Sequence, residues 1–254
     1  MAISIKSDHE INLMREAAEI LIGAHEELAK HIRIGVTPKE LDLIAEKFIK
    51  RKNAYPSFLN YNGYPGSACI SINEEVVHGI PSKRKLADGD IVSIDLGVYY
   101  KGYHSDAART YAVGNVSSDK LKLMEVTKEC FFQGLKYAKP GYHLNDISSA
   151  IGEYAEKHGY GVVRDLVGHG IGKKLHEEPQ VPNYKTPRRG PKLQKGMVLA
   201  IEPMINMGTW QVRVLDDDWT FVTRDGSPSA HYENTVVITD DIPEILTLRK
   251  DLGK

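Results

Sequence analysis

The sequence predicts an α+β domain built as two similar halves, and three observations lead to this prediction. Amphipathic helical segments come in two pairs, at about 8–52 and 119–158. Each pair is followed by short segments with the β-branched and apolar composition of strands. Motifs of the first half recur in the second half in the same order, which indicates an internal duplication. We therefore expect one domain over 1–254, with related halves at about 8–114 and 119–240.

The first pair of helices carries clear start signals. Ser7 and Glu10 have the spacing of a capping box ahead of a helix that should run to about residue 30. Thr37, Pro38 and Glu40 supply a cap, a proline in the first turn and the glutamate that closes the box. The second helix should therefore begin here and run to about residue 52.

The second pair of helices is expected at about 119–138 and 145–158. In the first half, the Gly- and Pro-bearing segment YPSFLNYNGYPGSA (55–68) predicts loops between the second helix and the strands. The strands expected in the second half lie at about 160–167, 197–206, 211–223 and 231–239.

Four short motifs recur in order. They are GVTPKEL (35–41) with GYHLNDI (141–147), VHGI (77–80) with GHGI (168–171), LADGDIVSID (86–95) with LQKGMVLAIE (193–202), and HSD (104–106) with HYE (231–233). The last two pairs align Asp95 with Glu202 and Asp106 with Glu233. Acidic positions related in this way would face each other where the two halves join.

The segment IVSIDLGVYYKGYHSDAART (91–110) predicts a β-hairpin with a two-residue turn at 101–102. In that register Asp106 lies opposite Gly97 and on the same face as Asp95, roughly 5–8 Å from it. The absence of a side chain at Gly97 should leave space between the two carboxylates. Two like charges this close repel each other, so they need a cation or a shared proton.

Structural explanations for one buried aspartate are an ion pair with Arg or Lys, or a pair of acids that share a proton. The second half makes these explanations insufficient, because Glu202 in VLAIEP and Glu233 in SAHYENTVVIT also interrupt apolar strands. No arginine lies within the flanking apolar runs. One or two hard divalent cations would accommodate all four carboxylates.

Histidines extend this acidic set. His169 and His176 lie in the glycine-rich stretch RDLVGHGIGKKLHEEP, and His78 lies in the corresponding VVHGIP of the first half. From the residues alone, either His169 or His176 can supply an imidazole ligand. Carboxylates with imidazole suit Mn²⁺, Fe²⁺, Co²⁺ or Zn²⁺, whereas a structural zinc site would use cysteine. The histidines expected at the surface, without a role, are His9, His25, His31, His143 and His158.

Composition excludes several classes of protein. Charged residues make up 26% of the chain and the net charge is −1, which predicts neither DNA nor a membrane as a partner. No apolar run approaches the roughly 18 residues of a membrane span, and no secretory signal is evident at the N-terminus. Two cysteines, Cys69 and Cys130, indicate a reducing compartment, so we expect the protein in the cytoplasm.

Taken together, these motifs resemble the type I methionine aminopeptidases. The motifs that match the family in order are NYNGYPGSACISINEEVVHGIP, DIVSIDLGVYYKGYHSDAARTY, GHGIGKKLHEEP, GMVLAIEPMI and HYENTVVIT. The resemblance implies the pita-bread fold, with two pseudo-twofold halves and a curved antiparallel sheet covered by helices on its outer face. The chain shows neither the zinc-binding extension of some eukaryotic relatives nor the large insertion of the type II branch.

The resemblance also implies a reaction and a set of site residues. The family removes the N-terminal methionine of nascent proteins and peptides whose second residue is small, through hydroxide activated by two divalent metal ions (Co, Mn, Fe, Zn or Ni). Asp106 and Glu233 would bridge the ions and Glu202 would accept a proton. His176 would stabilise the oxyanion and His78 would position the substrate. The implied metal ligands are Asp95, Asp106, His169, Glu202 and Glu233.

Further residues match the substrate pocket and a monovalent-cation site of relatives. The pocket residues are Phe58, Tyr61, Tyr64, Cys69, Leu175 and Trp219, and the cation site would use Asn73, the backbone of Glu75, and Ser229. Phe58 and Leu175 depart from relatives that have a small thiol residue and a phenylalanine there, and some of these side chains could instead pack a core. We expect a monomer. The basic loops 82–85 and 185–192 are compatible with transient ribosome contact, although such loops are more often merely solvated.

Two other functions compete with this interpretation. A proline-directed peptidase of the same fold uses the same five ligands, but such chains usually carry an additional N-terminal domain that 254 residues cannot include. A binding protein that kept the fold and lost the metals would have lost ligand residues, and all five are present.

Overall fold

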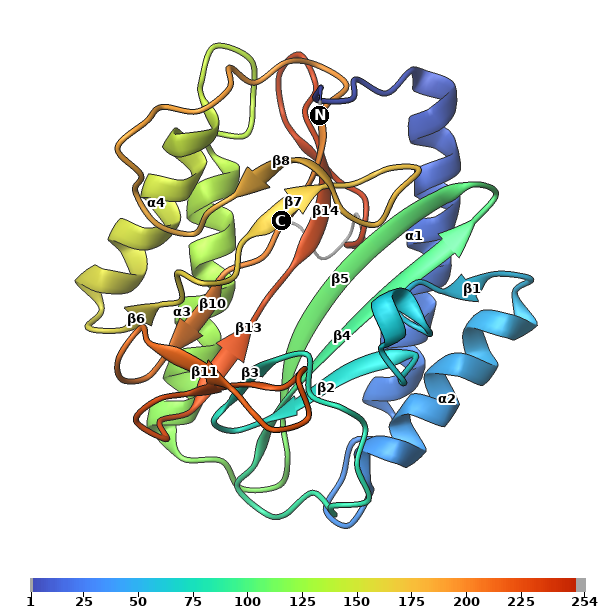
Figure 1. Ribbon diagram of the computed structural model, residues 1–254, viewed down its shortest axis with the longest axis vertical. Helices are drawn as coiled ribbons and strands as arrows, with labels where there is room; N and C mark the ends of the chain where they lie inside the picture. Colours follow the sequence, from blue (N-terminus) through green and yellow to red (C-terminus); the bar gives the residue numbers. More distant parts are fainter. Residues whose placement is uncertain (1, 250–254) are drawn as a thin grey trace.

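The helices of each half cover their own strands. The computed structural model describes residues 2–249, and Figure 1 shows α1 and α2 on one side of the molecule and α3 and α4 on the other, with the strands between them. The helices are α1 (Asp8–Ala29), α2 (Pro38–Arg51), α3 (Ser118–Leu135) and α4 (Leu144–Lys157). None of the helices within 2–249 has the length and apolar character of a membrane span.

The predicted capping boxes are confirmed. The hydroxyl of Ser7 accepts from the backbone N–H of Glu10 and the Glu10 carboxylate accepts from the N–H of Ser7, while Thr37 and Glu40 do the same at α2. The third helix is shorter than predicted and ends at Leu135.

The strands of the first half are built around the hairpin. They are β1 (Tyr55–Pro56), β2 (Ala68–Ile72), β3 (Glu75–Val77), β4 (Ile91–Tyr100) and β5 (Tyr103–Ala112). A short 3₁₀ helix (Tyr61–Gly63) follows β1. Strand β4 pairs with β1 and β2 on one side and with β5 on the other. The hairpin has the predicted register, with Gly97 opposite Asp106 and Tyr100 opposite Tyr103.

The strands of the second half are shorter. They are β6 (Gly161–Val162), β7 (Gly168–Gly170), β8 (Glu177–Val181), β9 (Val198–Ile201), β10 (Met204–Asn206), β11 (Val212–Val214), β12 (Phe221–Thr223), β13 (Ser229–His231), β14 (Asn234–Val237) and β15 (Glu244–Ile245). One sheet has the order β15-β14-β9-β7-β8. Two three-stranded sheets have the orders β13-β10-β6 and β11-β12-β3.

Several predicted strands are interrupted, and the interruptions have a physical reason. The segment 197–206 leaves the five-stranded sheet after β9 and joins β13 as β10, because Glu202 and Pro203 break the ladder between them. The segment 231–239 likewise changes sheets between β13 and β14, at Tyr232 and Glu233. Both glutamates therefore lie where a strand passes from one sheet to another.

Two other strand predictions were too long. The segment 211–223 is two strands, β11 and β12, which pair with each other across a turn. Of 160–167, only the two residues of β6 pair as a strand.

The two halves meet along β5 and β14. The backbone N–H of Asp106 donates to Thr235 Oγ1 at 2.9 Å, and that hydroxyl donates to the Asp106 carbonyl at 2.8 Å. The N–H of Glu233 donates to the Ala108 carbonyl at 3.0 Å. Arg109 donates to the backbone carbonyl of Glu233 and, from the same guanidinium, to Ala108. These bonds tie the carboxylate-bearing strands of the two halves together.

Each half has its own apolar core. One buried cluster joins α1 and α2 to β2 and β4, with Leu21, Leu41 and Ile94 fully buried. A second cluster joins α3 and α4 to the strands of the second half, with Phe131 and Ile151 fully buried. The predicted α+β pita-bread architecture, with helices that cover the strands, is confirmed.

Candidate active site

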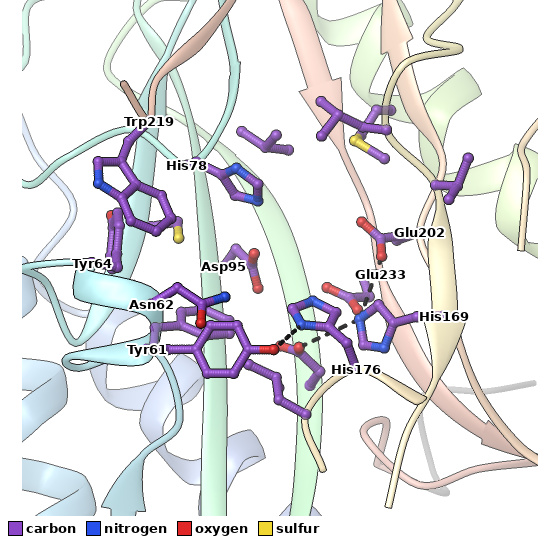
Figure 2. Close-up of a pocket in the computed structure, with 18 residues that line it drawn as sticks. Tyr61, Asn62, Tyr64, His78, Asp95, His169, His176, Glu202, Trp219 and Glu233 are labelled. Atoms are coloured by element: carbon purple, nitrogen blue, oxygen red, sulfur yellow. Dashed lines mark hydrogen bonds and ion pairs between the residues drawn. The ribbon is translucent and has the colours of Figure 1, made fainter. Parts of the chain in front are cut away.

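Four carboxylates from four chain segments converge between the halves. Asp95 projects from β4 and Asp106 from β5, while Glu202 follows β9 and Glu233 precedes β14. Figure 2 shows Asp95, Glu202 and Glu233 directed toward a common space together with His169. Asp106 and Glu233 are 3% and 2% exposed. The sequence therefore predicted a set of acids that the fold brings together.

The two histidines of the glycine-rich stretch have different surroundings. The Nδ1 of His169 is 2.9 Å from the Gly170 carbonyl, so Nδ1 carries the hydrogen and Nε2 is left with its lone pair. That Nε2 lies 3.9 Å from Asp106 Oδ2 and 3.7 Å from Glu202 Oε1. The Nδ1 of His176 is instead 2.8 Å from the hydroxyl of Tyr61, across the cavity (Figure 2). Of these two histidines, His169 is the one that directs a ring nitrogen at the carboxylates.

Burial shifts the pKa values of the whole cluster. It raises the pKa of Asp95 to about 7, and His231 is the group that most opposes this rise. Burial also raises the pKa of Glu202 to about 8. For Asp106 and Glu233, burial and then repulsion by neighbouring carboxylates raise the pKa well above the ordinary value. Burial lowers the pKa of His169 to about 3, so its imidazole is neutral and able to bind a cation.

The cluster fits a divalent metal. Within residues 2–249, no Lys or Arg forms an ion pair with any of the four carboxylates, which removes the salt-bridge explanation. Buried oxygens of Asp95, Asp106 and Glu233 also lack a hydrogen-bond partner. Ligand atoms of Asp106, His169 and Glu233 lie within 4.8 Å of one another. Hard oxygens with one imidazole are the donors that first-row divalent cations accept.

Two histidines differ from the sequence-based expectation. His25 was expected at the surface, but it is 7% exposed, and its ring contacts the Ala107 carbonyl at 2.9 Å and the Tyr111 hydroxyl at 3.3 Å. The apolar residues around His25 at helical spacing were the sequence feature that could have predicted its burial. His231 received no role from the sequence, yet its Nε2 lies 3.5 Å from Glu202 Oε2. Its position two residues before Glu233 in the HYE motif was the sequence feature that could have placed it near the carboxylates.

A cavity of ≈ 260 Å³ opens beside the carboxylates. All six predicted pocket residues line it: Phe58, Tyr61, Tyr64, Cys69, Leu175 and Trp219. The sequence did not identify five further lining residues: Asn62, Val77, Leu166, Val167 and Met204. Four of the six predicted residues are also members of a buried apolar cluster, and Tyr61 and Trp219 pack against it. The core-packing and pocket interpretations therefore both hold.

His78 lines the same cavity opposite the carboxylates (Figure 2). Its backbone has φ of 59°, and its ring packs edge-on against Phe221 at 5.7 Å between centroids. Burial lowers its pKa to about 4. The imidazole is therefore neutral and fixed in orientation.

Gly97 has a different role from the one predicted. A Cβ built on it would lie 2.6 Å from Ser57 Cβ and 2.9 Å from Phe58 Cε1. The glycine therefore admits the close approach of the loop that carries Phe58, and it does not leave an empty space between Asp95 and Asp106.

The predicted monovalent-cation residues lie away from this cavity. The carbonyl of Asn73 accepts from the N–H of Ser229 at 2.8 Å, and Glu75 begins β3 nearby. The side-chain oxygen of Asn73 accepts from Lys120 Nζ at 2.9 Å. An ammonium group is thus already bound to the Asn73 side chain.

Comparisons with known proteins agree with this geometry. The model of metallopeptidase family M24 matches residues 12–240. The methionine aminopeptidase of Clostridium acetobutylicum is 58% identical over 97% of this chain and 99% of its own length. Methionine aminopeptidase 1 of Bacillus subtilis is 55% identical over 96% and 99%.

Solved structures place the chain on the same fold. The methionine aminopeptidase of Thermotoga maritima superposes with a TM-score of 0.95 at 45% identity, covering 98% of this chain and all of that one. The prolidase of Pyrococcus furiosus superposes less well, with a TM-score of 0.79 at 27% identity, and this chain covers only 66% of it. The chain therefore belongs to metallopeptidase family M24, in its methionine aminopeptidase branch.

Proposed function

We propose that this chain removes the N-terminal methionine from nascent proteins and peptides whose second residue is small. The observation that carries the proposal is the contact between a buried carboxylate–imidazole cluster and an apolar cavity of ≈ 260 Å³. The cluster supplies the donors of a hydrolytic metal centre. The cavity, lined by Tyr64, Cys69 and Trp219, offers an apolar and polarizable wall to an unbranched thioether.

Five residues would hold two divalent metal ions: Asp95, Asp106, His169, Glu202 and Glu233. Within residues 2–249, Asp95, Asp106 and Glu233 each have a buried side-chain oxygen without a hydrogen-bond partner, which supports their role as ligands. Bound in this way, such a pair of ions lowers the pKa of water and polarises a carbonyl group. Co, Mn, Fe, Zn and Ni all accept these donors, and availability decides among them.

The side chains around the centre have separable tasks. The Glu202 carboxylate would accept the proton of the attacking water and return it to the leaving amine. His176, held by Tyr61 at Nδ1, would direct Nε2–H at the oxygen on which negative charge develops. His78, fixed against Phe221, would orient the substrate amide.

The cellular setting follows from the substrate. Nascent polypeptides occur in the cytoplasm, and free Cys69 and Cys130 are compatible with its reducing conditions. Because all proposed site residues come from one chain, a monomer suffices. The exposed basic loops 82–85 and 185–192 would be the segments that contact the ribosome transiently.

Two peptides test the proposal against proline-directed cleavage, which the likeness to prolidase keeps as the competing activity. Purified protein with Mn²⁺ or Co²⁺ is incubated with Met-Ala-Ser and with Ala-Pro-Ala, and the products are separated by chromatography. Release of free methionine from the first peptide only is expected. Cleavage of Ala-Pro-Ala in preference to Met-Ala-Ser would refute the proposal.

A further inference from the structure

His231 is a buried imidazole whose ring nitrogens have no hydrogen-bond partner within residues 2–249. The residue is 1% exposed, and neither Nδ1 nor Nε2 is within bonding distance of an acceptor or donor. An unsatisfied buried polar group costs about 1–3 kcal/mol. The placement of this ring therefore needs an explanation.

The backbone holds His231 firmly at this place. Its N–H donates to Thr110 Oγ1 at 3.0 Å, and the Thr110 hydroxyl donates to its carbonyl at 2.9 Å. Its Cα pairs with that of Met204 in the ladder between β10 and β13. The imidazole therefore lies beside Glu202, on a strand whose backbone these hydrogen bonds hold in place.

The Glu202 carboxylate lies between two imidazoles. Its Oε1 is 3.7 Å from His169 Nε2, on the side of the other carboxylates. Its Oε2 is 3.5 Å from His231 Nε2. A carboxylate that binds metal through one oxygen is commonly held by a hydrogen bond to the other. The separation of 3.5 Å is closed by a small rotation of either side chain into the range of a hydrogen bond.

We propose that His231 is a positioning residue, whose Nε2–H binds Oε2 of Glu202 and directs Oε1 toward the metal centre. This inference rests on the proposed function, in which Glu202 is both a metal ligand and the proton acceptor. Without this donor, the Glu202 carboxylate would be free to rotate out of the orientation that metal binding and proton acceptance require. Metal affinity and kcat should therefore fall together, while KM for the peptide changes little.

Three variants test the inference. His231→Leu keeps a buried side chain of similar size without a donor, and His231→Gln restores an N–H donor of similar reach. His25→Gln is the matched control, because it removes another buried imidazole whose hydrogen bonds within residues 2–249 are to the Ala107 carbonyl and the Tyr111 hydroxyl. Should His231→Leu fail to fold, His231→Met, which also lacks a donor, takes its place.

The measurements are the Mn²⁺ dissociation constant and stoichiometry of metal-free protein by titration calorimetry, and kcat and KM with Met-Ala-Ser. His231→Leu should weaken Mn²⁺ binding and lower kcat, each about 10–100-fold, with unchanged stoichiometry. His231→Gln should recover most of the Mn²⁺ affinity and of kcat, and His25→Gln should bind Mn²⁺ as wild type does.

Wild-type affinity and kcat in His231→Leu would overturn the inference. Loss of a whole metal equivalent in both His231 variants would also overturn it, since His231 would then be a ligand. Wild-type protein that binds no Mn²⁺ would instead refute the proposed function.

Discussion

His169 and His176 are seven residues apart in one glycine-rich segment, and the partners of their Nδ1 atoms separate them. His169 gives Nδ1–H to a backbone carbonyl and presents Nε2 to the carboxylates. His176 uses Nδ1 with the Tyr61 hydroxyl. The sequence left the choice of ligand open at this point, because spacing does not reveal which nitrogen of a ring is already occupied.

The two histidines should respond differently to substitution. In His176→Ala, kcat should fall about 10²–10³-fold with little change in KM, because the lost donor matters mainly when charge develops on the carbonyl oxygen. Metal content should stay at the wild-type level. His169→Ala should lower metal occupancy, measured by elemental analysis after dialysis. Loss of metal from His176→Ala and retention in His169→Ala would reverse these roles.

Single residues that line the cavity should also decide substrate choice. A cavity lined by Tyr64, Cys69 and Trp219 should accept methionine or norleucine and reject charged side chains, since a charge would be desolvated there without a partner. The second residue should be small, because we expect it to pass near the proposed metal centre and the histidines His78 and His176, which line the same cavity. Peptide cleavage rates measured for Met-Ala, Met-Lys and Met-Trp series check this expectation. Efficient cleavage of Met-Lys or Met-Trp would contradict it.

At the scale of elements, the site depends on how loops and helices meet the hairpin. Gly97 lies under the loop that carries Phe58, and His25 joins α1 to the β5 backbone at Ala107. Neither contact could be predicted from the sequence, because each joins segments more than 35 positions apart through a single close approach. The internal duplication stays a prediction based on the recurring motifs.

Gly97→Ala should destabilise the fold by about 1–3 kcal/mol, because its Cβ would overlap Ser57 and Phe58. Urea denaturation monitored by circular dichroism measures the free energy of unfolding. The double variant Ser57→Gly/Gly97→Ala removes the nearest clash and should recover part of the loss. If the stability changes of the two single substitutions simply add in the double variant, the overlap with Ser57 is not the cause of the destabilisation.

His25 should make the protein less stable in mild acid. Burial, and then the charge of Arg109, lower its pKa from 6.5 to about 3. Between these values the unfolded chain binds a proton that the folded chain does not, so the free energy of unfolding falls as the pH drops below about 6.5. At pH 5, protonation of His25 in the unfolded chain should lower the free energy of unfolding by about 2 kcal/mol relative to pH 8. In His25→Gln the stability should fall less over that interval, measured by urea denaturation of metal-free protein, and an identical fall would refute the assignment.

At the scale of the whole molecule, the proposed metal centre lies where the two halves of the chain meet. Its proposed ligands come from both halves, so bound metal would link them. Without metal, the four carboxylates repel each other, and the raised pKa values of Asp106 and Glu233 indicate that protonation relieves part of the repulsion.

Removal of metal should abolish activity and destabilise the fold only moderately. Mn²⁺ at about 100 times its dissociation constant should add about 2.7 kcal/mol to the free energy of unfolding of the metal-free protein, for one site. Thermal unfolding with and without Mn²⁺ after chelation measures this change, and MgCl₂ at the same concentration controls for ionic strength. Protein that binds no divalent metal under any loading condition would contradict the dinuclear centre.

The α+β class, the capped helices, the hairpin register and the set of acids with His78, His169 and His176 could be predicted from the sequence, because they depend on local propensity, residue periodicity and short motifs. The breaks in the second-half strands became visible in the folded chain, since Glu202 and Glu233 leave their ladders where the chain changes sheets. The tertiary structure also decided which imidazole nitrogen is free, that His25 is buried, and that His231 lies beside Glu202. These features arise from contacts between segments far apart in the chain. A local pattern, such as the apolar neighbours of His25 at helical spacing, can indicate burial, but it does not encode the distance at which such segments meet.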